Sequence, residues 1–380
     1  MPYAGSDSDD LVHRFPGFAG VRDGLPLPPG DVPVPERVAE VLGRAADHLG
    51  VSPMDPRARR QLREWYEQVS PRYVISRKFL RPDALSASDA RHHPRRLRYR
   101  VDARTRITAH LLEHPGWIAD SWSAAALLGI GDFSDGADTC VTHSGNRRLS
   151  TDPLRPTQHR KPASLPVWTV YLNDAPMKVT PPTVTLIRCL RSVLIEEHAW
   201  QVPKIARLSE PLIRAVQVID RFRRGLGIDE RHIAEVGRGL IDARKLARII
   251  SLSGPGTDSP QETLLRLIAG QAAARSGAEF LPQVPVYCDG RIGEACSKEA
   301  GVPLLTVLDL AEVTWKIALM FDGAHHWTKK QRERDARINF ELAHSGWLVL
   351  RVSYGMFNDA SGLAAKIEEA IRERISEAAA

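Results

Sequence analysis

The sequence has no apolar run that approaches the roughly 18 residues needed for a membrane span, so no transmembrane helix is predicted. Its first residues, MPYAGSDSDDLVHRF, contain neither a basic nor an apolar segment, and a secretory signal is therefore not expected. The cysteines include no CxxC pair, and no second pair joins Cys288 and Cys296 to complete a zinc site or a disulfide framework. We expect free thiols in a reducing, cytoplasmic compartment, with a metal or disulfide role as the minor alternative.

Length and composition indicate a globular protein of two or three domains. The chain has 380 residues, of which 43% are hydrophobic and 26% charged, enough to bury sizeable cores. Lysine and arginine number 52 against 46 acidic residues, which gives a formal net charge of +6. This mild excess is compatible with nucleic-acid binding and does not establish it, because many basic proteins bind no polyanion.

The first hundred residues are expected to form a tail and a helical region. Residues 1–35 are rich in glycine, proline and aspartate and should be extended or disordered. In residues 36–100, apolar residues at helical spacing predict a pair of helices, and a strongly basic segment follows, RHHPRRLRYRVDARTR. This segment is either a solvated charge run or an arm that contacts phosphates, for which the candidates are Arg95, Arg96 and Arg98.

Residues 101–253 are predicted to form a middle region. A helix over 103–113 is followed by a Pro-Gly turn, by a second helix from Ser121 or Ser123, and by strand-like segments such as VTHSG and VWTVYLN. This order favours a winged helix–turn–helix, although an αα-hairpin that serves only packing gives the same pattern. Further helices are expected farther along the chain, over residues 208–225 and 229–250.

Residues 259–380 have the element order of an α/β layer. The stretch SPQETLLRLIAG begins a helix with an acid in its first turn. FLPQVPVY, TVLDLAEV and TWKIALMFDG are predicted strands, the last two joined by a tight turn. KKQRERDARINFELAHSG is a helix that ends at Gly346, WLVLRVSYG is a buried strand, and LAAKIEEAIRERISE is a final helix. The order of helix, three strands, helix, strand and helix fits such a layer.

Three acids stand at informative places in this layer. Glu262 lies on its first helix, Asp309 lies in the middle of the central strand, and Asp322 ends the next strand. A charged residue in a buried strand is costly unless it is paired or binds a metal. Carboxylates gathered at adjoining strand ends would hold Mg²⁺, which prefers oxygen ligands and assists attack on a phosphodiester. Each acid taken singly also has a structural explanation, and Asp322 with Gly323 is equally typical of a turn.

The phrases SPQETLLRLI, LDLAEVTWKIALMFDGAHHW and RERDARINFELAHSGWLVLRVS make residues 259–355 resemble the PD-(D/E)XK nuclease superfamily. The similarity is to its very-short-patch-repair endonuclease-like branch. The phrases ITAHLLEHPGWIADSWSAAALLGI and VYLNDAPMKVTPPTVTLIRCLRSV make residues 103–250 resemble an AbiEi-type antitoxin-like region. The resemblance implies an α+β multidomain protein with a helical and winged helix–turn–helix N-terminal part. Its C-terminal part would be an α/β restriction-endonuclease-like domain.

The resemblance also implies roles for individual residues. Glu262, Asp309 and Asp322 would be catalytic and would hold Mg²⁺ or Mn²⁺, with His326 assisting. The third motif of the superfamily has an acid two residues before the aspartate, where this chain has Met320. A thioether is a poor ligand for Mg²⁺, so this departure bears directly on whether catalysis survives. The lysine of the superfamily is also absent from its expected place.

The basic face of the helix that starts near residue 329 is the last candidate. Lys329, Lys330, Arg334 and Arg337 either form a solvated face with intrahelical ion pairs or contact DNA phosphates. Three functions stay open: a metal-dependent DNA endonuclease, a non-catalytic DNA-binding regulator of the antitoxin kind with a degenerate nuclease fold, and a protein–protein interaction module on the same scaffold. DNA is the expected partner in the first two cases, and a toxin or defence-system partner is a further implication of the resemblance.

Overall fold

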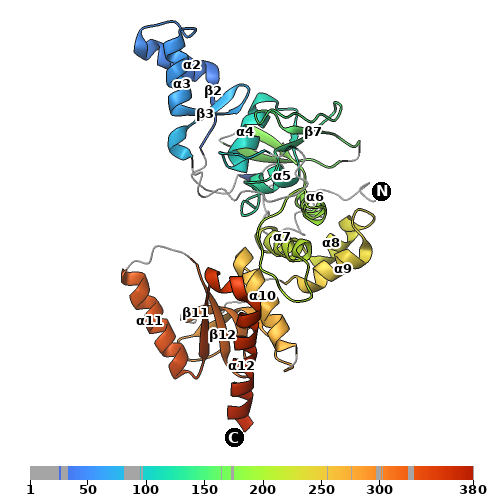
Figure 1. Cartoon of the computed structure of the whole chain (residues 1–380), viewed down its shortest axis with the longest axis vertical. Coiled ribbons are helices and arrows are strands. Elements are labelled where there is room, and N and C mark those ends of the chain that lie inside the picture. Colours follow the sequence, from blue (N-terminus) through green and yellow to red (C-terminus); the bar gives the residue numbers. More distant parts are fainter. Residues whose placement is uncertain are drawn as a thin grey trace. The chain divides into compact units, whose positions relative to one another are not determined.

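The structure is a computed structural model of the 380-residue chain (Figure 1). It describes residues 25–26, 33–80, 95, 97–163, 165–172, 175–254, 256–274, 276–296, 301, 303–323 and 329–379. The chain divides into two compact units: unit 1 is Met1–Trp200 with Gly225–Ala243, and unit 2 is Gln201–Arg224 with Arg244–Ala380. Helices and strands occur in both, so the chain is an α+β protein. Within the described ranges, no helix has the combination of length and apolar composition that crossing a membrane requires.

Unit 1 begins with a short helical region that carries a small sheet. Its elements are β2 (Glu36–Arg37), α2 (Val38–Leu49), α3 (Pro56–Trp65), β3 (Tyr66–Ser70), β4 (Tyr73–Ser76) and the 3-10 helix η2 (Arg77–Phe79). The predicted helix pair is confirmed, but the chain changes to a β-strand directly after α3. The three strands pair antiparallel in the order β2-β4-β3. Most of the predicted tail, residues 1–35, lies outside the described residues, apart from β1 (Leu25–Pro26) and the residues from 33 onward.

The rest of unit 1 is built on a six-stranded sheet in the order β1-β8-β9-β5-β6-β7. Its elements are α4 (Ala103–Glu113), β5 (Ile118–Ala119), α5 (Ser121–Leu127), β6 (Cys140–His143), β7 (Thr157–Arg160), β8 (Trp168–Leu172), β9 (Ala175–Val179), α6 (Pro182–Leu194) and α8 (Glu230–Gly237). The helix pair expected from residue 103 is present. The sheet has six strands and contains parallel pairs, β6–β7 among them, and the winged helix that the sequence favoured stays a prediction.

Unit 2 contains a four-stranded mixed sheet in the order β10-β11-β12-β13. Its elements are α7 (Glu210–Leu226, which runs into unit 1 at its end), α9 (Ala243–Leu252), α10 (Pro260–Ala273), β10 (Leu281–Tyr287), β11 (Leu304–Glu312), β12 (Ile317–Asp322), α11 (Lys329–His344), β13 (Leu348–Ser353), the 3-10 helix η4 (Tyr354–Asp359) and α12 (Ala360–Ala379). β10, β11 and β12 pair antiparallel, and β12 pairs with β13 in parallel. From α10 onward, the predicted order of helix, three strands, helix, strand and helix is confirmed.

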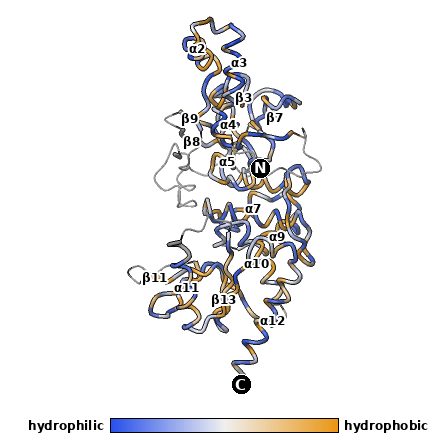
Figure 2. The backbone as a smooth tube through the Cα atoms, turned by 60° about the vertical axis from the view of Figure 1, so that its left-hand side comes forward, coloured by the Kyte–Doolittle hydropathy of each residue, from blue (hydrophilic) through white to orange (hydrophobic). Residues whose placement is uncertain are grey.

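Helices cover both faces of this sheet. Figure 1 shows β11 and β12 between α11 on one side and α10 with α12 on the other. Hydrophobic and hydrophilic stretches alternate along α12 (Figure 2), whose buried residues recur at helical spacing as Leu363, Ile367, Ala370 and Ile371. This spacing places an apolar stripe on one side of the helix, and α12 packs with that stripe inward.

Helices α7 and α9, which we grouped with the middle region, contribute most of their length to unit 2. Asp220 of α7 accepts hydrogen bonds from Nη2 of Arg266 (2.6 Å), Oγ1 of Thr263 (2.9 Å) and the amide of Gly254 (2.9 Å). Burial raises the pKa of Asp220, and the Arg266 guanidinium opposes that shift. A buried acid with these partners fixes α7 to α10, which is why the boundary of unit 2 lies before residue 259.

Candidate acidic site at the ends of β11 and β12

The acids predicted from the sequence lie on three different elements of unit 2. Glu262 is in the first turn of α10, Asp309 is in β11, and Asp322 is the last residue of β12. The β11–β12 register runs from Glu312 paired with Ile317 to Leu310 paired with Leu319. Just beyond it, the amide of Phe321 donates to Oδ2 of Asp309 over 2.7 Å. The Asp309 carboxylate therefore accepts a hydrogen bond that a main-chain carbonyl usually accepts in a ladder.

Glu262 is held by the capping structure of α10. Its backbone amide donates to Oγ of the N-cap residue Ser259 (3.2 Å), and the Ser259 hydroxyl donates to Oε1 of Glu262 (3.0 Å). Oε2 accepts from the amide of Asp258 (2.9 Å) and from Nε2 of Gln283 on β10 (3.0 Å). Burial raises the pKa of Glu262, these hydrogen bonds oppose the shift, and Asp258 adds to it.

Asp309 has the most perturbed carboxyl group of the site. Burial raises its pKa to about 7, the hydrogen bond from Phe321 opposes the shift, and the charges of Glu262, Asp258 and Asp322 add to it. These carboxylates are thus close enough to repel one another. A carboxyl group that titrates near neutrality is suited to accept or donate a proton.

Asp322 already has a cationic partner on the neighbouring strand. Nη1 of Arg351 on β13 lies 2.6 Å from Oδ1 of Asp322, and Nη2 of Arg351 donates to Oδ1 of Asn339 on α11 over 2.9 Å. In the parallel register, Arg351 is paired with Met320 and Asp322 with Ser353. The arginine therefore starts beside Met320 and extends along the sheet to the acid two residues further on.

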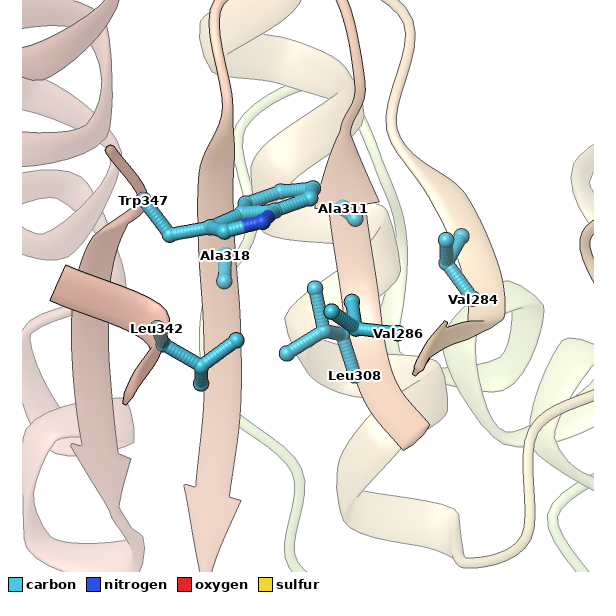
Figure 3. Packing of buried hydrophobic residues seen from close by; sticks show 7 residues of the cluster. All are labelled: Val284, Val286, Leu308, Ala311, Ala318, Leu342 and Trp347. Carbon is cyan, nitrogen blue, oxygen red and sulfur yellow. The ribbon is translucent and has the colours of Figure 1, made fainter. Parts of the chain in front are cut away.

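Met320 belongs to the hydrophobic core of the sheet. It packs against the cluster drawn in Figure 3, which consists of Val284, Val286, Leu308, Ala311, Ala318, Leu342 and Trp347. Leu342 comes from α11, so this cluster joins the sheet to that helix. The side chain that stands in the place of a third-motif acid is thus a packing residue.

The carboxylate oxygens of Glu262, Asp309 and Asp322 are suitable ligands for a hard cation, but their present arrangement does not form a metal site. Among the residues that the structure describes, no three histidine, cysteine, aspartate or glutamate side chains are grouped to hold an ion. Both oxygens of Glu262 accept hydrogen bonds, and Asp322 is paired with Arg351. Glu262, Asp309 and Asp322 are therefore not arranged to ligate Mg²⁺ or Mn²⁺ in this structure.

The remaining predicted site residues have varied placements. His326 and Arg96 lie outside the described residues. Lys329 and Lys330 begin α11, where only the backbone is described, and Arg334 and Arg337 are exposed on the same helix. Arg98 is also exposed, in unit 1.

Arg95 is buried, which corrects the prediction that it contacts phosphates. Its side chain is 1% exposed, and its Nε donates to Oδ1 of Asp138 over 2.8 Å. The hydroxyl of Tyr99 donates to the same oxygen over 2.7 Å. Burial alone would raise the pKa of Asp138, but Arg95, Thr157 and Tyr99 together lower it. Arg95 is thus a structural counter-ion, because folding brings it to an acid 43 residues further along the chain.

Arg351 and Asn339 are the partners in the acidic site that we did not single out in the sequence. Arg351 stands inside WLVLRVSYG, a segment predicted to be a buried strand. A charged residue in a buried strand needs a partner. This holds for Arg351 as it does for Asp309. Asn339 gave no comparable signal, because a polar residue on an amphipathic helix is ordinary.

No protein-family model matches the chain, and neither a curated protein nor a solved structure matches it.

Proposed function

We propose that the chain is a DNA-directed protein whose unit 2 is a restriction-endonuclease-like domain that hydrolyses phosphodiester bonds. The observation that carries this proposal is the position of Glu262, Asp309 and Asp322. They lie on the first helix, the central strand and the next strand of a mixed four-stranded sheet, and their charges interact. Burial raises the pKa values of Glu262 and Asp309, and grouped carboxyl groups with raised pKa values are typical of sites that handle protons and phosphates.

Asp309 is the residue on which hydrolysis should depend. Its carboxyl group has a pKa of about 7, so it is present both as acid and as base at neutral pH. Glu262 is fixed by Ser259 and Gln283, which makes it a rigid neighbour. Mg²⁺ or Mn²⁺ is the cofactor that the resemblance implies, and the assay must supply it.

The test compares nicking of supercoiled plasmid and of duplex oligonucleotides by the native chain, Asp309→Asn and Glu373→Gln, with Mg²⁺ or Mn²⁺ present. Glu373 is exposed on α12, so its substitution removes one carboxylate away from the acids and serves as the matched control. Loss of a group that transfers protons costs about 10²- to 10⁴-fold in rate, so Asp309→Asn should be at least about 100-fold slower than the control. Intact substrates with the native chain under all conditions would refute the proposal.

The second candidate is a non-catalytic DNA-binding regulator of the antitoxin kind, and two observations favour it. Met320 packs in the core, and Asp322 is neutralised by Arg351. In that case the nuclease-like sheet is a scaffold, and a toxin or defence-system protein is the expected partner. Binding to its own promoter in EDTA, with equal affinity for the native chain and Asp309→Asn, is the expected result. A requirement for a divalent metal in binding would count against this role.

A further inference from the structure

Residues 38–76 of unit 1 have the order helix, turn, helix and β-hairpin. α2 ends at Gly50, whose φ of 61° is left-handed and lets the chain reverse direction. α3 starts at Pro56, with the side chain of Asp55 accepting a hydrogen bond from the amide of Arg57 (2.8 Å). β3 follows α3 without a break, and β4 completes the hairpin.

One side of this helix–hairpin element is fixed by packing. Ala45 and Ala46 of α2 and Ala58 of α3 form a buried cluster, which allows the two helices a close approach. In the hairpin, Tyr73 and Ile75 belong to another cluster that includes Ala109 of α4. These contacts determine which face of α3 points away from the protein.

The outward face of α3 carries three arginines. Ala58 is fully buried, and Arg60 and Arg63 stand two and five residues later, which places them on the opposite side of the helix. Arg59 flanks them, and all three are exposed. Within the described part of the chain, none of these three arginines forms an ion pair, and Arg59 has only the sulfur of Met54 as a partner (3.5 Å).

The hairpin extends the same positive charge. Arg72 lies in its turn; its side chain is 77% exposed, and its Nε lies 3.9 Å from Oε1 of Glu113. Arg77 and Lys78 follow β4 and are also exposed, and Arg77 forms an ion pair with Glu67 over 3.0 Å. Over residues 54–80, seven basic residues stand against three acidic ones. This segment therefore presents an excess of positive charge to a polyanion, and within it Arg59, Arg60 and Arg63 of α3 are exposed side chains without an ion pair among the described residues.

We propose that α3 lies in the major groove of duplex DNA, with the hairpin turn on the adjacent phosphate backbone. α3 has 10 residues and is therefore about 15 Å long, and the major groove of B-form DNA, about 12 Å wide, admits a helix. The groove of A-form RNA is too narrow for this, so duplex RNA is the disfavoured ligand. This proposal rests on the DNA-directed role but not on hydrolysis, since the surface is in unit 1 and the acids are in unit 2.

The test measures binding of the full chain to a fluorescein-labelled duplex of random sequence by anisotropy, in EDTA, at several salt concentrations. EDTA removes divalent metal, so a failed nuclease activity does not affect the reading. Arg60→Gln/Arg63→Gln is compared with Arg244→Gln/Arg248→Gln, which removes two charges from the exposed face of α9. Each lost phosphate contact lowers the slope of log K against log salt by about 0.9.

The α3 pair should therefore reduce that slope by about 2 and weaken binding about tenfold or more, while the α9 pair leaves both unchanged. Arg72→Gln should reduce the slope by about 1. Circular dichroism should show native folding in each variant, because the substituted side chains are exposed. Three results would overturn the proposal: no duplex binding by the native chain, equal slopes for the two double variants, or tighter binding to duplex RNA of the same sequence.

Discussion

Replacing Met320 by glutamate tests whether the acidic site lacks only one carboxylate. The new side chain would leave the cluster of Val284, Ala318 and Leu342 and would carry a charge beside other acids. Extending the register of Leu310 with Leu319 by one residue places Asp309 opposite position 320. We therefore expect Met320→Glu to destabilise unit 2 both by lost packing and by repulsion.

The expected loss of stability in Met320→Glu has two contributions, lost packing and charge repulsion. Full burial of a methionine is worth about 1.5–3 kcal/mol, and Met320 is partly buried, so Met320→Gln should cost about 1–1.5 kcal/mol. The pKa of Asp309 rises from 3.8 to about 7 in the same surroundings. A less buried carboxylate beside Arg351 should show about one unit of that shift, which is worth about 1.4 kcal/mol. Met320→Glu should then be about 1.4 kcal/mol less stable than Met320→Gln, and Met320→Leu should be close to native.

The assay is urea unfolding at pH 8 in EDTA, followed by circular dichroism and tryptophan fluorescence, because Trp347 is part of the cluster that Met320 contacts. Adding Mn²⁺ should stabilise Met320→Glu but not Met320→Gln, since only the former adds a ligand for a hard cation. Equal stability of Met320→Glu and Met320→Gln in EDTA would refute the repulsion argument. Native stability of Met320→Gln would refute the packing argument.

Three further predictions concern unit 1. Arg95→Met should lower the free energy of unfolding by about 3–5 kcal/mol in chemical denaturation, because it leaves Asp138 buried and unpaired. The control Arg98→Met, at an exposed position, should leave the free energy of unfolding almost unchanged. Burial lowers the pKa of His110 to about 3, so the unfolded chain takes up a proton below pH 6.5 and the folded chain does not. As the pH is lowered from about 6.5 to 3, the free energy of unfolding should fall by about 1.4 kcal/mol per pH unit. His110→Gln should show a shallower pH dependence of unfolding. An unchanged slope would contradict the attribution of this pH dependence to His110. Gly50→Ala should cost about 1 kcal/mol of thermal stability through its left-handed backbone alone, since nothing lies within 4 Å of an added Cβ.

Local features of the sequence were sufficient to predict most elements of unit 2. Ser259, Pro260 and Glu262 indicate a helix start by their own hydrogen-bonding capacity, and α10 begins there. Strand segments were recognisable because they are short and apolar, and a charged residue inside one, Asp309, pointed to a special environment. These are properties of neighbouring residues, which a single sequence contains.

Features that depend on distant pairing could not be predicted in the same way. The order β1-β8-β9-β5-β6-β7 joins strands that are far apart in the chain, and no local pattern specifies it. The arginine run suggested solvent or phosphate, but the partner of Arg95 is Asp138 in the core. The partner of Asp322 is Arg351, 29 residues away. This ion pair, together with the hydrogen bonds to Glu262, occupies carboxylate oxygens that a shared metal ion would need. Net charge and spacing do not identify such partners.

The path of the chain between the two units has a practical consequence for dissecting the protein. The chain passes from one unit to the other after Trp200, after Arg224 and after Ala243, so no single cleavage separates them. A fragment that starts at residue 259 would lack α7 and leave Arg266 without Asp220, its buried partner. A folded fragment that carries the acidic site must therefore start near residue 201. It must either keep the segment Gly225–Ala243, which belongs to unit 1, or replace that segment by a linker.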